Sequence, residues 1–269
     1  MSDPTLQHQI EAAGAYEALF VPALFQQFGP KVADAAGINR GERVLDVACG
    51  TGVLAREILK RVGPTGCVSG IDRVPGMIEV AREIAPAIDW REGKAEALPF
   101  SDESFDAVVS QFGLMFFSDP VQAIREMLRV LNARGRFAVA VWDSLNNIPA
   151  YAAADELLQR ILGQEASDAL RAPFTLGDRD ALRKVFSEAG ANAIEISTHS
   201  GTAVFPSIRT MVEADLRGWL PVMGVNLSEE QISQALHEAE TALAAYVTSN
   251  GEVRFHLSAH IVNGKRSGQ

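Results

Sequence analysis

The chain has 269 residues, 47% hydrophobic and 22% charged, which is typical of a globular protein that buries a sizeable core. Its net charge of −10 would repel nucleic-acid phosphates and anionic membrane surfaces, so neither is an expected partner. The amino terminus, MSDPTLQHQI, lacks the apolar stretch of a signal peptide, and no apolar run is long enough to span a membrane. The two cysteines, Cys49 and Cys67, fit no disulfide or metal pattern, so we expect a cytoplasmic protein.

Residues 1–40 predict a helical cover. The apolar spacing indicates a helix over 7–20. Pro22 and Pro30 then predict two short helices, because proline suits a first helical turn.

From 41 to 145 strands alternate with helices, which predicts a doubly wound parallel sheet. The expected strands are 43–47, 67–71, 89–92, 105–110 and 136–142. The expected helices are 52–61, 75–84 and one from Asp119-Pro120 to about 131.

After Trp142 this alternation breaks. We expect one further helix and strand, and a single domain throughout 1–269. Ser228 and Gln231 form a predicted capping box at the start of a cap helix. The remaining predicted elements are helical cap insertions at 148–172 and 207–249, a helix at 180–188, a strand at 193–200 and a final strand within 250–263.

The stretch VLDVACGTGVLA, at 44–55, carries the first chemical signal. Gly50 and Gly52 begin a G-x-G-x-x-A turn, and Asp72 follows Gly52 by twenty residues, as a carboxylate that accepts ribose hydroxyls would. NAD and other adenosine ligands fit this pattern equally well. Asp46 lies inside the preceding apolar strand, where a pyrophosphate would gain nothing from a negative charge. A ligand that carries a positive ammonium and a sulfonium would instead be attracted by the negative charge of Asp46.

VLDVACGTG resembles the first motif of the class I S-adenosylmethionine-dependent methyltransferases. Ile71-Asp72 resembles their acidic second motif, and GKAEALPFSDESFDAVVSQFGLMFF their third region. The chain is similar to the family over about 40–143, and most like the small-molecule branch that includes the ubiquinone and menaquinone C-methyltransferases. The resemblance implies S-adenosylmethionine as cofactor, S-adenosylhomocysteine as product, and a Rossmann-like seven-stranded sheet. In that sheet the last strand is antiparallel and lies between the fifth and sixth.

The resemblance also assigns cofactor contacts. Backbone groups of the turn and residues after the fourth strand would hold the methionine end, Asp72 the ribose, and a loop after the third strand the adenine. Lys94 stands where the family often has an aspartate for the adenine amino group, and lysine only donates hydrogen bonds. The expected cofactor residues are Asp46, Ala48, Gly50, Thr51, Gly52, Asp72, Arg73, Met77, Ala95, Glu96, Gln111 and Phe112.

No catalytic residue is assigned, because in-line methyl transfer draws much of its rate from alignment, with effective molarities of ~10⁵ M or more. His256 and His260 share a strand face but lack a third ligand, so no metal is expected. Apolar cap residues predict an apolar small-molecule acceptor, namely Phe174, Phe205, Met211, Trp219 and Met223. Further candidates for cofactor or acceptor contacts, each as readily explained by packing, are Tyr16, Trp142, Asp143, Tyr151 and Arg217.

Two other functions fit the glycine turn. An NAD(P)-dependent oxidoreductase is disfavoured by Asp46 and by the lack of a Tyr-x-x-x-Lys pair. A catalytically silent S-adenosylmethionine-binding protein stays open. A nucleic-acid methyltransferase is disfavoured because Gln111-Phe112-Gly113-Leu114 stands where an Asn/Asp-Pro-Pro-Tyr/Phe motif would. Helical caps of this kind sometimes pair subunits, so a homodimer is one expected assembly.

Overall fold

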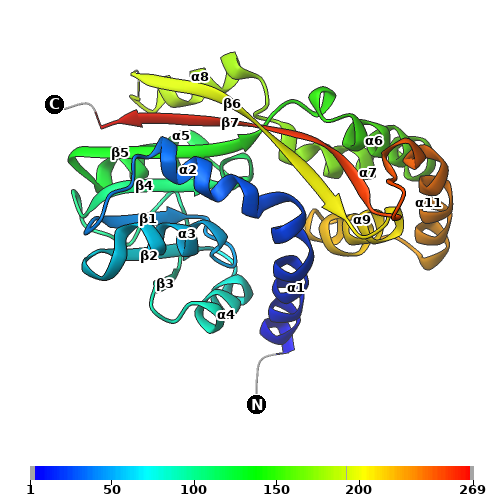
Figure 1. Ribbon diagram of the computed structural model, residues 1–269, viewed down its shortest axis with the longest axis horizontal. Helices are drawn as coiled ribbons and strands as arrows, with labels where there is room; N and C mark the ends of the chain where they lie inside the picture. Colours follow the sequence, from blue (N-terminus) through cyan, green and yellow to red (C-terminus); the bar gives the residue numbers. More distant parts are fainter. Residues whose placement is uncertain (1–3, 192, 267–269) are drawn as a thin grey trace.

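The computed structural model describes residues 4–191 and 193–266. Seven strands form one sheet in the order β3-β2-β1-β4-β5-β7-β6, and β7 is antiparallel to both neighbours while the other adjacent pairs are parallel (Figure 1). This confirms the predicted doubly wound sheet and the place of its last strand. The strands are β1 (Arg43–Val47), β2 (Cys67–Asp72), β3 (Asp89–Glu92), β4 (Phe105–Gln111), β5 (Leu131–Trp142), β6 (Ile194–Phe205) and β7 (Val253–Lys265).

Helices cover both faces of the sheet because its strands alternate two sets of apolar side chains. In β1, Val44 packs with α2 (Gly29–Ala35), α3 (Val53–Val62) and α4 (Pro75–Ile84), whereas Leu45 faces α5 (Pro120–Val130) and α8 (Arg179–Glu188). Asp46 therefore shares the α3 face with Val44, where an apolar side chain would ordinarily stand. The Asp119 side chain caps α5 by accepting from the Gln122 amide, as the Asp-Pro pair predicts.

Three strands are longer than predicted. β5 begins at Leu131, which pairs with Phe105 across a bulge, rather than at 136. β6 and β7 run as a long antiparallel pair to the register Phe205–Val253, where both side chains are fully buried. Because β6 runs to Phe205, five residues past its predicted end at 200, the pair extends beyond the parallel sheet and carries the cap (Figure 1).

The helical cap lies at the far end of the β6–β7 pair (Figure 1). It comprises α6 (Pro149–Leu162), α7 (Gln164–Arg171), α9 (Ile208–Ala214), a π-helical turn (Asp215–Trp219), α10 (Leu220–Val222) and α11 (Glu229–Ala242). The predicted capping box of Ser228 and Gln231 is present at the start of α11. Among the described residues, no helix combines the length and the apolar character needed to cross a membrane.

The amino-terminal cover reaches from the cap side of the molecule to the sheet. Its first helix, α1 (Pro4–Phe20), packs on α4 so closely that a Cβ at Gly76 would collide with the Gln9 backbone. Pro22 stands in the first turn of a short helix, as predicted, but that helix is of the π type and follows α1 without a break. Pro22 lies in a π-helical turn (Val21–Phe25) that continues the chain after α1, because a residue without an N–H cannot make the regular helical hydrogen bond.

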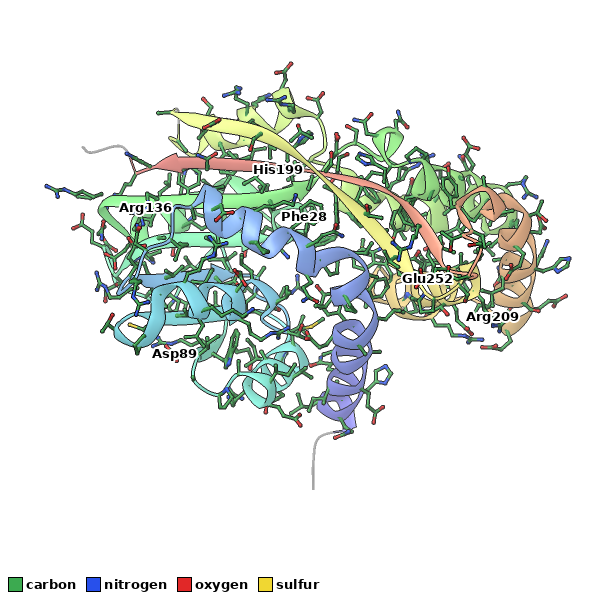
Figure 2. The ribbon with its side chains drawn as sticks, viewed as in Figure 1. Phe28, Asp89, Arg136, His199, Arg209 and Glu252 are labelled. Atoms are coloured by element: carbon green, nitrogen blue, oxygen red, sulfur yellow. The ribbon has the colours of Figure 1, made fainter. Side chains whose placement is uncertain are left out.

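Two side chains then fix the cover on the sheet. Phe28 is fully buried between the cover and the sheet, and Arg136 of β5 donates to the Ala36 carbonyl at 2.9 Å (Figure 2). The same guanidinium pairs with Glu42 at 2.6 Å. The last part of the cover is therefore held beside the start of β1, whereas the turn that contains Phe25 lies beside the end of β4.

Candidate functional site

The turn after β1 is built from residues with positive φ. Gly50 has φ 53° and Gly52 φ 89°, a region that glycine enters without steric cost. Ala48 also has φ 56°, which is uncommon for a residue with a side chain and marks a constrained position. A Cβ at Gly52 would collide with the Trp90 ring, so that glycine is required by packing inside the protein as well as by the turn.

Asp46 lies beneath this turn with 1% of its surface exposed. Neither carboxylate oxygen has a hydrogen-bond partner among the described residues. Burial raises the pKa of Asp46 well above its usual range, the nearby Ala55 amide, outside hydrogen-bond geometry, acts to lower it, and the negative charge of Asp72 raises it further. A buried carboxyl without a partner is costly, because it has lost its water and gained no hydrogen bond.

Asp72, at the end of β2, is a buried carboxylate of a different kind. Its two oxygens accept hydrogen bonds from the amides of Gly50 and Val74, each at 2.9 Å. Burial raises its pKa, and these hydrogen bonds act in the opposite direction. Asp72 thus ties the glycine turn to β2 and keeps further lone pairs for hydroxyl donors.

The end of β4 adds two more unpartnered polar groups next to the turn. Within the part of the chain that the structure describes, the Ser110 hydroxyl and the Gln111 Oε1 have no partner, while the Gln111 Nε2 donates to the Phe25 carbonyl at 3.2 Å. Phe112 follows with φ 58°. Its neighbour Gly113 leaves no room for a Cβ against Ala48, so the ends of β1 and β4 meet here.

Aromatic side chains surround the end of β4. Phe112 stacks on Trp142 with ring centres 3.8 Å apart and an interplanar angle of 12°. Phe25 and Phe28 of the cover each lie within 6 Å of both rings. Trp142, which the sequence placed at the carboxyl edge, therefore belongs to an aromatic wall beside the turn.

The cover locks onto the turn through a pair that sequence reasoning missed. Glu17 of α1 accepts from the Thr51 hydroxyl at 2.5 Å and pairs with Arg56 at 2.6 Å. The Tyr16 ring lies 4.0 Å from the Cβ position of Gly50, and burial, followed by the nearby charge of Asp72, raises the pKa of its hydroxyl. No pattern links residues 39 positions apart, so only the fold could bring Glu17 to Arg56.

The residues predicted for the adenine lie in the loop after β2, in the first turn of α4 and in the loop after β3. Arg73 is exposed and Met77 half-buried, and neither belongs to an apolar core. Ala95 is buried, and Glu96 accepts from the Ser118 amide and hydroxyl, each at 2.8 Å. Glu96 therefore shapes the loop before α5 through one oxygen, and the exposed Lys94 adjoins the same loop.

Asp143 and His260 form a second polar cluster on the opposite face of the sheet. Asp143 accepts from Asn147 at 2.9 Å, Ser258 at 2.8 Å and the Ser144 amide at 2.7 Å, and the His260 Nε2 lies 3.1 Å away. Although burial raises the pKa of Asp143, these hydrogen bonds outweigh it and lower the pKa below its usual range.

His260 is itself fully partnered inside that cluster. Its Nδ1 lies 2.9 Å from the Thr198 hydroxyl and its Nε2 3.0 Å from the Gly177 carbonyl, while His256 on the same strand is exposed. The structure therefore does not bring the two histidines together, and His260 ties β7 to β6 and to the loop before α8.

The cap contains two further buried aspartates with different surroundings. Asp155 of α6 accepts from Ser167 at 2.6 Å and pairs with Arg171 at 2.6 Å. Asp215, at the start of the π-helical turn, is 6% exposed and has no hydrogen bond or ion pair within residues 4–191 and 193–266. Burial raises the pKa of Asp215 to about 7.

The remaining predicted cap residues separate into core and surface. Phe205 and Met211 are fully buried, whereas Met223 is exposed. Trp219 donates its Nε1–H to the Ala169 carbonyl at 2.8 Å, and Arg217 pairs with Glu229 on the surface. Trp219 and Arg217 are thus engaged in contacts within the cap.

Comparisons with known proteins agree with this geometry. A family model described as a methyltransferase domain matches residues 44–135. A demethylmenaquinone methyltransferase of Staphylococcus aureus is 33% identical over 179 residues, which cover 61% of this chain and 74% of that protein. The solved structure of the YcgJ protein of Bacillus subtilis superposes with a TM-score of 0.57 at 22% identity, covering 89% of this chain and 98% of that one.

A second solved structure is similar in fold although more distant in sequence. It is a phosphoethanolamine N-methyltransferase of Haemonchus contortus, in complex with phosphomonomethylethanolamine and S-adenosylhomocysteine. It superposes with a TM-score of 0.59 at 15% identity, covering 96% of this chain and 58% of that one. At these identities the two solved structures show a shared fold.

Proposed function

Because this chain belongs to the class I S-adenosylmethionine-dependent methyltransferases, we propose that it transfers the methyl group of that cofactor to a small, mostly apolar acceptor. The acceptor would bind where the carboxyl ends of the strands meet the cover and the cap. The observation that carries this proposal is Asp46, a buried carboxyl without a partner beneath a glycine turn. A ligand with a positive ammonium supplies the missing partner.

The proposed cofactor site follows the three strand ends. Asp46 would pair with the ammonium, and the turn at Gly50 and Gly52 would approach the methionine end closely. Asp72, already positioned by two amides, would accept the ribose hydroxyls. Gln111 keeps an unpartnered Oε1 that also suits an ammonium.

The adenine would lie over the neighbouring loops. Met77 could pack on its face, and Ala95 could offer a backbone group. Arg73 would flank it. With Glu96 held by Ser118, and lysine at 94, the adenine amino group would depend on backbone acceptors.

The chemistry that this chain would supply is alignment and exclusion of water. Bound S-adenosylmethionine carries a methyl group already activated for displacement. Phe112 and Trp142 form an apolar wall beside the turn, and Phe25 closes it from the cover. Orienting an acceptor against such a wall can supply effective molarities of ~10⁵ M or more. A general base is needed only where the acceptor atom must lose a proton, and adds ~10²–10⁴-fold.

The proposed class of acceptor is supported by the demethylmenaquinone methyltransferase relative and by the aromatic wall of Phe112 and Trp142. The relative at 33% identity is named for demethylmenaquinone, an apolar ring compound, and the aromatic side chains here offer flat apolar surface to a ring. We therefore favour an acceptor with a fused or single aromatic ring, methylated at O, N or C.

The test measures cofactor binding and methyl transfer to an acceptor in separate experiments. Calorimetric titration should show micromolar affinity for S-adenosylmethionine and S-adenosylhomocysteine, none for NADH, and a large loss of affinity in Asp72→Ala. Transfer of labelled methyl should then occur to naphthoquinol or phenol acceptors. Cofactor binding without transfer to any apolar ring, together with transfer to small cationic amines, would contradict the proposed acceptor class.

A further inference from the structure

Tyr151 of α6 and Asp215 of the cap share an unusual situation. Each is only 6% exposed, and neither side chain has a hydrogen bond or ion pair in the part of the chain that the structure describes. Buried hydroxyl and carboxyl groups in native proteins are almost always hydrogen-bonded to protein or to ordered water. Unlike the Asp46 oxygens, the polar atoms of these two side chains are not completely closed off from solvent, so a water or a ligand can reach them. The nearby Asp155 shows that the same cap partners a buried carboxylate fully where the role is structural.

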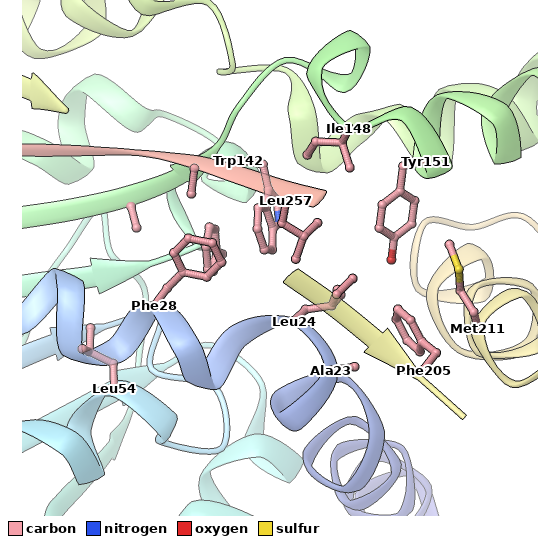
Figure 3. Packing of buried hydrophobic residues seen from close by; sticks show 14 of the residues in the cluster. Ala23, Leu24, Phe28, Leu54, Trp142, Ile148, Tyr151, Phe205, Met211 and Leu257 are labelled. Atoms are coloured by element: carbon pink, nitrogen blue, oxygen red, sulfur yellow. The ribbon is translucent and has the colours of Figure 1, made fainter. Parts of the chain in front are cut away.

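The two groups come from different elements, Tyr151 from α6 and Asp215 from the π-helical turn after α9. After burial itself, the Asp215 charge is what raises the pKa of the Tyr151 hydroxyl. Asp215 follows Met211 by one helical turn, and Figure 3 shows the Tyr151 hydroxyl pointing away from α6 toward the side chains of Leu24, Phe205 and Met211. Met211 and Phe205 are fully buried. The polar pair is therefore enclosed by apolar side chains of the cap, the β6–β7 pair and the cover.

The surroundings of Tyr151 and Asp215 are continuous with the aromatic wall beside the glycine turn. Leu24 belongs to the π-helical turn that ends at Phe25, and Tyr151 packs edge-on against Phe255, 5.6 Å between ring centres. Asp215 begins a second π-helical turn, a feature often found at functional sites. One apolar cluster thus joins Trp142 to Tyr151.

We propose that Tyr151 and Asp215 form the acceptor-recognition pair of this enzyme, and that they bind a neutral hydroxyl or carbonyl group on an otherwise apolar ring. This proposal rests on the proposed function. A carboxyl held protonated in apolar surroundings donates one hydrogen bond and accepts another, and the phenol does the same. Such a pair rejects an isosteric ligand without a polar group, since the buried hydroxyl and carboxyl would again lack partners.

The pair acts on recognition, and no proton transfer to the cofactor is assigned to it. The elevated pKa of Asp215, about 7, agrees with a carboxyl that is about half protonated at neutral pH and mostly protonated at the pH 6.5 of the experiment below. A cationic ligand would instead favour the ionised carboxylate. The proposal commits to a neutral polar group, and the cation is an outcome of the test.

The experiment uses three matched probes on the full chain saturated with S-adenosylhomocysteine: 2-naphthol, 2-methylnaphthalene and the cation 2-naphthylmethylamine. Equilibrium dialysis at pH 6.5 should show 2-naphthol bound at least ~10-fold more tightly than either of the others, the ratio that one well-made hydrogen bond supports. Tyr151→Phe and Asp215→Leu should each reduce that ratio to within about threefold of unity. Asp215→Asn, which keeps a donor and an acceptor, should preserve it.

A matched control separates recognition from packing. Tyr246 also packs on Phe255, with ring centres 6.2 Å apart, so Tyr246→Phe removes a hydroxyl from the same aromatic group and should leave the ratio unchanged. Equal binding of 2-naphthol and 2-methylnaphthalene, or a ratio unaltered in Tyr151→Phe, would overturn the proposal, as would preference for the cation. Because S-adenosylhomocysteine affinity is measured in every variant, failure of the methyltransferase site itself would register separately as loss of that affinity.

Discussion

Two buried carboxyl groups at the carboxyl edge of the sheet are treated in opposite ways. Asp143, after β5, is held by Asn147 and Ser258, and its pKa is lowered. Asp46, in β1, has no partner among the described residues, and burial raises its pKa. The first arrangement stabilises the fold by itself. The second costs stability until a ligand arrives, which is how a binding site differs physically from a structural polar cluster.

The largest expected effect is a loss of stability on removal of the Asp143 side chain. Asp143→Ala leaves the buried Ser258 hydroxyl without its partner and removes the contacts to Asn147 and His260, so the free energy of unfolding should fall by about 3 kcal/mol. Urea unfolding measures it. Affinity for S-adenosylhomocysteine should stay within about twofold, provided the titration is run well below the lowered unfolding midpoint. A variant of normal stability that no longer binds the cofactor would contradict this assignment.

The next effect concerns Asp46, whose substitution should weaken cofactor binding without lowering stability. Asp46→Asn removes the charge proposed to pair with the ammonium, so affinity for S-adenosylmethionine should fall about 100-fold, or about 2.7 kcal/mol. The free protein should unfold at the same or a higher urea concentration, since a buried unpartnered charge has been removed. Ser110→Ala, at the neighbouring unpartnered hydroxyl, serves as the control with little loss of affinity. Loss of stability without loss of affinity would assign Asp46 to the fold.

The stability contributions of Asp46 and Asp143 should depend on pH in opposite directions. The folded-state pKa of Asp46 is raised, so its contribution is fully present below about pH 3.8 and is lost as the pH rises toward the folded value. Asp143 has a lowered folded pKa, so its contribution is present above pH 3.8 and is lost on further acidification. Relative to Asp46→Asn, the wild type should lose up to about 1.4 kcal/mol per pH unit within the Asp46 window. Parallel curves for the two proteins would refute the raised pKa.

The sequence predicted the sheet because its signals are local. The Arg43–Val47 strand, the Pro75–Ile84 helix and the Ser228 cap each depend on neighbouring residues, and all are confirmed. Asp46 stands out in the sequence because it is a single acid inside an apolar strand. The carboxyl end of β6 escaped prediction because its last residues are held by β7, about fifty residues later in the chain.

Relations between distant residues were out of reach for the same reason. Asp155 and Asp215 look alike in the sequence, and only tertiary contacts decide that one meets Arg171 and the other meets no charged partner among the described residues. Likewise, Pro22 carries the local signature of a helix start, but nothing in the local sequence indicates the π-helical form that this turn takes. Local patterns therefore predicted elements and strand-end residues, whereas the state of each buried charge required the fold.

The smallest expected effect concerns the amino-terminal cover, which contacts the glycine turn through Glu17. Glu17→Gln weakens the pair with Arg56 and the bond from Thr51, contacts about one-fifth exposed, so the free energy of unfolding should fall by only about 1 kcal/mol. Because those contacts hold α1 on the turn, release of S-adenosylhomocysteine should become about threefold to fivefold faster in stopped-flow displacement. Glu188→Gln, which removes an exposed partner of Lys184 on α8, is the matched loss of one negative charge and should alter neither quantity. Unchanged release in Glu17→Gln would mean that the cover is no barrier to the cofactor, and that Asp46 and Asp72 alone determine its residence time.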